Sequence, residues 1–428
     1  MELLESIITL RVGDFLRSTW GTDPWVEIVI DLISVVVIST FCLLIVIFLI
    51  WLERKVIARI QDRLGPNRVG GRYGLLQTVA DVIKLLIKEL ITPTGIDGLS
   101  YNAAPILTVM AALLVWAVMP FAPGLIGVDL NIGIFYILAI SSVSVVTILL
   151  AGWGSNNKYA LLGAFRAVAQ LVSYEVPFIF ALLIPILLAR SMSTVDIIES
   201  QTVPYLFVVP LAALIFFVSA LAETGRTPFD LIEAESEIVS GFHIEYGGMK
   251  FGMFFLAEFV NTLFMSALFA TVFLGGWNIP IINLILGVFG LAPIDLNTLA
   301  MGRVIGLIVF FSKTFAVYFV FIWIRGTWPR VRVDQILGFN WKFMVPVSLV
   351  LILVVAILDK LIPANTNAVA RAAIILASNV LLAFLVLEAV RRHARRKRLE
   401  RLGPPATAVD AADMVAQEAH HPEAAPAH

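Results

Sequence analysis

The chain has 428 residues, of which 60% are hydrophobic and 14% are charged, and its formal net charge at pH 7 is −1. Soluble domains carry about 25% charged residues, so this chain cannot cover its apolar surface in water and must use lipid as a solvent. The near-zero charge gives no indication of nucleic-acid binding, and the single Cys42 excludes disulfides and cysteine-held metal clusters.

Several apolar stretches are long enough for membrane helices, which need about 20 residues. A shorter stretch at 279–292 contains Pro280 and is predicted to be re-entrant or interfacial. The sequence therefore predicts an all-α fold, a polytopic membrane helix bundle within residues 1–390. The predicted spans are 28–52, 103–122, 132–152, 167–189, 204–222, 251–276, 300–324, 343–362 and 368–390.

Lysine and arginine are distributed unevenly between the two sides of such a bundle. With nine spans, 23 of the 30 basic residues lie on one side and 5 lie on the other. Basic loops stay in the cytoplasm, so the N-terminus is predicted outside and the C-terminus in the cytoplasm. The loops 53–102 and 223–250 are then cytoplasmic.

The first cytoplasmic loop begins with ERKVIARIQDRLGPNRVGGRYG at 53–74. Its arginines are consistent with a functional site, and plain positive-inside anchoring is the alternative. It continues into 74–90, where a broad apolar face lies opposite Asp81 and Lys84. This segment is too charged to span, and we expect an amphipathic helix in the membrane interface. A helix packed against soluble domains is the alternative.

Two glutamates fall inside predicted spans that begin on the cytoplasmic side. Glu175 is the ninth residue of its span and Glu258 is the eighth, so at about 1.5 Å per residue both lie roughly 12–13 Å deep. Ionisable groups at such depths are costly and usually mark an ion path. We predict a shared polar cavity, with Lys313 as the counter-charge; a structural ion-pair cluster is the alternative.

The loop 223–250 is strongly acidic, and in a helix Asp230, Glu233 and Glu237 would share one face. Like charges this close can hold a shared proton, although a solvated acidic face that docks a basic partner is also consistent. The tail, 391–428, begins with a basic run suited to anionic headgroups and then becomes rich in Ala, Pro and Glu, which predicts disorder.

Four segments together carry a resemblance to a known family: ERKVIARIQDRLGPNRVG, KYALLGAFRAVAQLVSYEV, AETGRTPFDLIEAESEIVSGFHIEYGG and FFLAEFVNTLF. They resemble the membrane-arm subunits that help form the quinone site of respiratory complex I, a proton-pumping NADH:quinone oxidoreductase. The resemblance runs in order over roughly 25–390. Many members end at eight spans, whereas nine spans and a tail are predicted here.

The resemblance implies quinone as the substrate, in a chamber framed by the first span, the amphipathic helix and the sixth span. It implies a bacterial plasma membrane location, and partner subunits that include iron–sulfur and quinone-site subunits of the peripheral arm and antiporter-like membrane subunits. Flavin and iron–sulfur clusters are then expected in those partners. Implied chamber and entrance residues are Glu53, Arg54, Asp62, Arg63, Asp81 and Lys84; implied proton-coupling residues are Glu175, Glu223, Asp230, Glu233, Glu235, Glu237, Glu245 and Glu258.

Two other functions compete with this one. A membrane-bound hydrogenase-type complex uses a related subunit and would depend on hydrogen rather than NADH. A stand-alone cation/proton antiporter belongs to a different class and predicts inverted repeats, but the sequence has no clear internal repeat.

Overall fold

The computed structural model describes residues 12–21, 23–230, 241–289, 292, 294–299, 301–363 and 367–402. Within them the regular elements are all helices. In the first half of the chain these are α2 (Val12–Trp20), α3 (Pro24–Ile60), α4 (Gln77–Ile87), α5 (Gly98–Leu114), η1 (Val115–Val118), α6 (Gly133–Gly154), α7 (Lys158–Ala189) and α8 (Thr194–Glu199). In the second half they are α9 (Tyr205–Val208), α10 (Pro210–Glu223), η2 (Gly241–His243), α11 (Gly248–Leu274), α12 (Pro280–Val288), α13 (Gly302–Thr327), α14 (Val333–Phe339), η3 (Asn340–Met344), α15 (Val345–Leu361) and α16 (Ala368–Leu402).

Eight helical segments in the described residues are long and apolar enough to cross a membrane. The predicted all-α, polytopic membrane bundle is therefore confirmed. The remaining predicted span, 204–222, is occupied by α9 and the 14-residue α10. These two helices are separate because Pro210 starts α10 and has no amide hydrogen to continue the hydrogen bonding of the helix before it.

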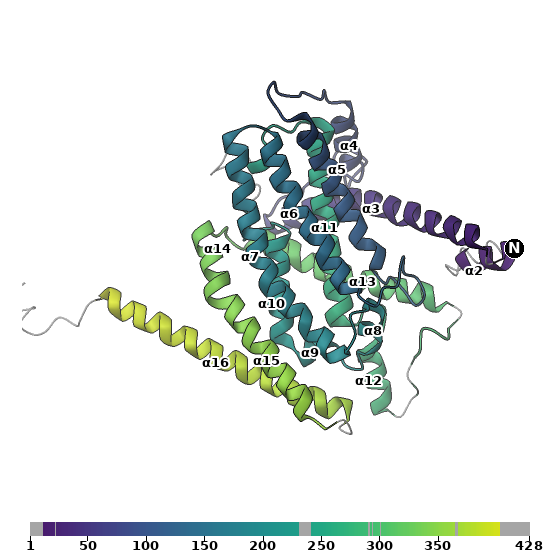
Figure 1. Cartoon of the computed structure of the whole chain (residues 1–428), viewed down its shortest axis with the longest axis vertical. Coiled ribbons are helices and arrows are strands. Elements are labelled where there is room, and N and C mark those ends of the chain that lie inside the picture. The colour runs from purple at the N-terminus through teal and green to yellow at the C-terminus, as the bar shows by residue number, and fades with distance from the viewer. Residues whose placement is uncertain are drawn as a thin grey trace, which may run out of the picture. The chain divides into compact units, whose positions relative to one another are not determined.

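The chain divides into two compact units, Met1–Leu376 and Ala377–His428. Of the second unit, the structure describes only the C-terminal part of α16. In the first unit α11 is the most buried of the eight long apolar helices, and it packs against α3, α4, α5, α10 and α13 (Figure 1). Buried aromatic side chains such as Phe264 and Phe273 fill these contacts.

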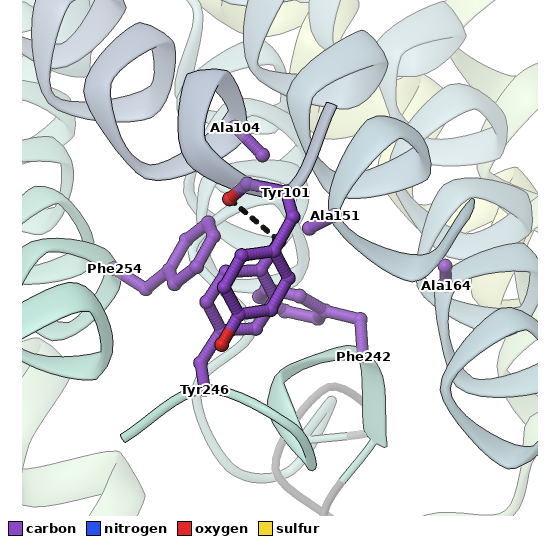
Figure 2. Packing of buried hydrophobic residues seen from close by; sticks show 7 residues of the cluster. All are labelled: Tyr101, Ala104, Ala151, Ala164, Phe242, Tyr246 and Phe254. Carbon is purple, nitrogen blue, oxygen red and sulfur yellow. Dashed lines mark hydrogen bonds between the residues drawn. The ribbon is translucent and has the colours of Figure 1, made fainter. Parts of the chain in front are cut away.

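A cluster of buried side chains joins the beginning of α5 to the segment that leads into α11 (Figure 2). The rings of Tyr101 and Tyr246 stack with centroids 4.3 Å apart, and the Tyr246 hydroxyl donates to the Tyr101 carbonyl at 3.2 Å. The Phe254 ring packs edge to face against Tyr246 and against Phe242. The cluster therefore fixes the chain between η2 and α11 against the bundle.

Candidate functional site

A group of four charged side chains lies where α3, α11 and α13 meet. Glu53 of α3 is only 5% exposed. Arg226 donates from Nη1 to both of its carboxylate oxygens, at 2.8 and 3.1 Å, and Arg325 of α13 donates to Oε1. Because a buried charge is stable only when it is paired, the two guanidinium groups hold Glu53 as a compensated carboxylate.

Arg226 reaches this position from a tight turn that follows α10. Gly225 has a φ of +61°, a conformation that glycine adopts at little cost. On either side of the turn, Gln170 of α7 donates from Nε2 to the carbonyls of Ala222 and Phe229, at 2.7 and 2.8 Å. The turn is thereby fixed to α7, and the Arg226 side chain, 3% exposed, extends toward α3 and α11.

The same guanidinium contacts a second carboxylate. Arg226 Nε lies 3.2 Å from Oε1 of Glu258 on α11, and its Cζ lies 4.5 Å from the ring centroid of Phe259. Arg226 therefore joins a carboxylate of α3 to a carboxylate of α11. Glu258 also lines a cavity of about 110 Å³, so the ion-pair group ends at the wall of this cavity.

This cavity lies between α5, α6, α7, α11, η2 and the end of α10. Glu223, the last residue of α10, lines it, and its Oε2 is buried without a hydrogen-bond partner among the described residues. An unsatisfied buried carboxylate oxygen is costly, so Glu223 is suited to bind a proton or water. A cavity of this volume has room for several water molecules.

Glu175 of α7 lies next to α6 rather than in the cavity wall. It accepts a hydrogen bond from the Ser142 hydroxyl at 2.7 Å, while Ser141 and Ser144 on the same helix line the cavity. The carboxylate that shares the cavity with Glu258 is therefore Glu223, not Glu175. The three carboxylates occupy neighbouring helices around one polar region.

The predicted role of Lys313 as their counter-charge is wrong. Its ammonium group donates to the carbonyls of Leu274, Gly276 and Asn278, at 2.8, 2.9 and 2.5 Å. Leu274 ends α11, 16 residues beyond Glu258, which is about 24 Å along the helix. Depth estimated from the sequence did not reveal the direction in which this long side chain extends.

The implied entrance residues fall into two groups. Arg54 of α3 donates from Nη1 to Oδ2 of Asp81 on α4 at 2.5 Å, and Lys84 Nζ lies 3.9 Å from Asp81 Oδ1. These three residues therefore meet where α3 packs against α4. Asp62 and Arg63 instead lie in the exposed turn that follows α3.

The acidic loop is described only at its two ends. Asp230 is half-buried at the first end, and Glu245, at the second, accepts a hydrogen bond from Asn157 Nδ2 at 2.7 Å. Glu233, Glu235 and Glu237 lie outside the described residues. The shared acidic face therefore stays a prediction.

Sequence reasoning assigned no site role to Arg226, Arg325 or Ser142. Both arginines entered only a count of cytoplasmic charges. A usable signal was present for Arg226, which is the single cation between Glu223 and Glu245. Among the described residues, no group of three or more His, Cys, Asp or Glu side chains is arranged to hold a metal ion, and the site's chemistry rests on carboxylates and guanidinium groups.

Comparison with known proteins places this arrangement in a family. The family model described as NADH dehydrogenase matches residues 33–356. The H subunit of NADH-quinone oxidoreductase from Dehalococcoides mccartyi (strain CBDB1) is 44% identical over 335 residues, covering 78% of this chain and 88% of that protein. The protein of the same name from Geobacillus kaustophilus (strain HTA426) is 47% identical over 306 residues, 71% of this chain and 86% of its own length. The chain, a multi-pass membrane protein by its helices, therefore belongs to the NADH dehydrogenase family.

Proposed function

We propose that this chain is the membrane subunit of a proton-translocating NADH:quinone oxidoreductase, where it helps form the quinone chamber and couples quinone reduction to proton movement. The name of its relatives supports the reaction. The observation that carries the coupling role is the bridge made by Arg226, which contacts Glu53 on α3 and Glu258 on α11. No other contact described above links the α3 carboxylate to the cavity so directly.

The chamber is proposed to lie beside α3, α4 and α11, which pack against one another. The Arg54–Asp81 pair holds α4 to α3, while Ile83 and Leu86 of α4 are exposed and apolar. Such a helix suits the membrane interface, where a quinone's apolar tail can remain in lipid while its polar ring enters the protein. The ring would then approach the charged group around Glu53.

Quinone reduction and proton movement are coupled because the reduced quinone and Glu53 compete for the same two arginines. Negative charge that develops on the quinone attracts Arg226 and Arg325, which Glu53 otherwise holds. When Arg226 moves, Glu258 loses its contact with that guanidinium, and its carboxylate becomes able to take a proton from cavity water. Glu223 and then Glu175 extend this carboxylate path toward α6 and α7, and each holds or releases one proton at a carboxyl oxygen.

Electrons must reach the quinone from partner subunits. An iron–sulfur cluster is held by cysteine thiolates, commonly four, and this chain has one cysteine. We therefore place flavin and iron–sulfur clusters in the peripheral-arm partners, and antiporter-like membrane subunits beyond the carboxylate path. We also place the chain in a bacterial plasma membrane. The excess of basic residues on one side supports an N-terminus outside and a C-terminus in the cytoplasm.

Replacing Glu223 tests this function. Glu223→Gln keeps the size of the side chain but removes its titrating proton, so we expect quinone-dependent turnover and proton uptake to fall by about 10²-fold. The measurement uses the assembled complex in sealed vesicles. NADH oxidation by a water-soluble acceptor, which does not need the chamber, should keep the wild-type rate.

Glu199→Gln is the matched control because Glu199 is exposed at the end of α8. It should leave all three rates at the wild-type level. Full turnover with full proton uptake in Glu223→Gln would contradict the proposed coupling.

A further inference from the structure

His243 is the one histidine that lies before the C-terminal segment, since the others fall within 393–428. It ends η2 and lines the same cavity as Glu223 and Glu258. An imidazole can accept a proton at one ring nitrogen and donate one from the other. The cavity therefore holds a third titratable group that the proposed coupling path does not yet use.

The imidazole is held in place by close packing. A Cβ atom added at Gly163 of α7 would lie 2.6 Å from the carbonyl carbon of Gly241, so the absence of a side chain there lets η2 approach α7 directly. The His243 ring then packs with centroids 5.2 Å from Phe242 and 5.3 Å from Phe251. These two contacts keep the ring at the cavity wall.

Among the described residues, the charges that face His243 in the cavity are both negative. They belong to Glu223 and Glu258, which line the cavity together with the polar Thr108, Ser141, Ser144, Thr224 and Asn261. η2 packs against α6 and α7. α6 contains no charged residue, and the charged residues of α7, which are Lys158, Arg166 and Glu175, do not line the cavity.

We propose that His243 carries protons between Glu258 and Glu223 across the cavity. The step rests on the proposed function and needs no co-reactant. A carboxyl O–H bond of Glu258 breaks and an imidazole N–H bond forms, directly or through one cavity water, giving carboxylate and imidazolium. The other ring nitrogen then gives up its proton to the Glu223 carboxylate, and the neutral imidazole is restored in its other tautomer.

The resting charge of His243 suits this step. Burial lowers the pKa of His243 to about 4, so the imidazole is neutral at pH 7 and free to accept a proton. An ionised Glu223 carboxylate favours the imidazolium and raises that pKa again. His243 therefore takes the proton of a protonated Glu258 while Glu223 is ionised, and then gives it up to Glu223.

The first test is the pH profile of the assembled complex in sealed vesicles. His243→Gln keeps a polar side chain but removes titration, so protons must come from bulk water, whose proton concentration falls tenfold per pH unit. We expect the pH of half-maximal turnover on the alkaline side to drop by about one unit. Thr108→Val, which changes a polar group on the same cavity that already donates to the Ala104 carbonyl, should keep the wild-type profile.

An unchanged profile in His243→Gln would overturn the proposal, and so would an equal shift in Thr108→Val. Glu223→Gln separates the two hypotheses. Loss of coupling in that variant together with an unchanged profile in His243→Gln refutes only the role of His243, whereas full coupling in Glu223→Gln refutes the proposed function and the His243 step with it. Deuterium exchange at the imidazole C2 carbon, followed by mass spectrometry of the wild-type complex, needs no variant to fold. We expect an imidazole pKa well below its ordinary value, and an ordinary value would overturn the proposal.

Discussion

Glu53 and Glu223 are both buried glutamates, but their surroundings are opposite. Glu53 has two guanidinium partners, whereas Oε2 of Glu223 has no hydrogen-bond partner among the described residues and faces a cavity. Cationic partners offset the cost of burying a carboxylate, whereas a buried carboxylate oxygen without a partner keeps that cost. Glu258 belongs to both settings, since it contacts Arg226 and lines the cavity. The same bundle therefore contains a glutamate held in ion pairs and, in the part of the chain that the structure describes, a glutamate that faces a cavity without such a partner.

Replacing Arg226, which pairs with Glu53 and Glu258, should have the largest effect on the protein. Arg226→Gln leaves Glu53 and Glu258 without their shared cation, and loss of one partner of a buried ion pair costs about 3–5 kcal/mol. We expect little assembled complex, measured by subunit content in purified membranes. Arg17→Gln is the control, because the Arg17–Glu27 pair is exposed and such pairs contribute about 0–1 kcal/mol. Normal assembly in Arg226→Gln would show that Glu53 needs no compensation from it.

Lys313 sharpens the comparison, because its charge is compensated by carbonyl groups instead of a carboxylate. Lys313→Met removes three charge-assisted hydrogen bonds, and we expect a loss of about 1.5–3 kcal/mol in the stability of the subunit. Thermal unfolding of the complex in detergent measures this loss. Quinone turnover per assembled complex should stay at the wild-type level. A selective loss of turnover would place Lys313 in the coupling path after all.

Ser142→Ala should give the smallest effect. It removes the hydroxyl that donates to Glu175 in a solvent-exposed hydrogen bond, and such a bond is worth about 0.5–1.5 kcal/mol. We expect quinone turnover to fall severalfold, with assembly unchanged. Ser312→Ala serves as the matched control, since the Ser312 hydroxyl donates to the Ile308 carbonyl of its own helix. Equal turnover in both variants would show that Glu175 does not need the Ser142 hydrogen bond for its role in turnover.

The bundle was predictable from the sequence because apolar length alone identifies a membrane helix. The buried carboxylates were equally visible, since Glu175 and Glu258 interrupt apolar spans. Their partners were not, because Glu53 and Arg226 are 173 positions apart and meet only through the packing of α3, α10 and α11. A count of loop charges treats every cytoplasmic arginine alike. It therefore missed the one that is nearly fully buried.

Two side chains attach α13 to neighbouring helices at points far apart along its axis. Lys313 fastens it to the end of α11, while Arg325, 12 residues further along, is held by Glu53. That separation is about 18 Å along the helix axis. If quinone reduction draws Arg325 away from Glu53, a tilt of about 5° around Lys313 would move the arginine end by about 1.5 Å. The attachment at Lys313 would then hold one end of α13 in place while the arginine end moves.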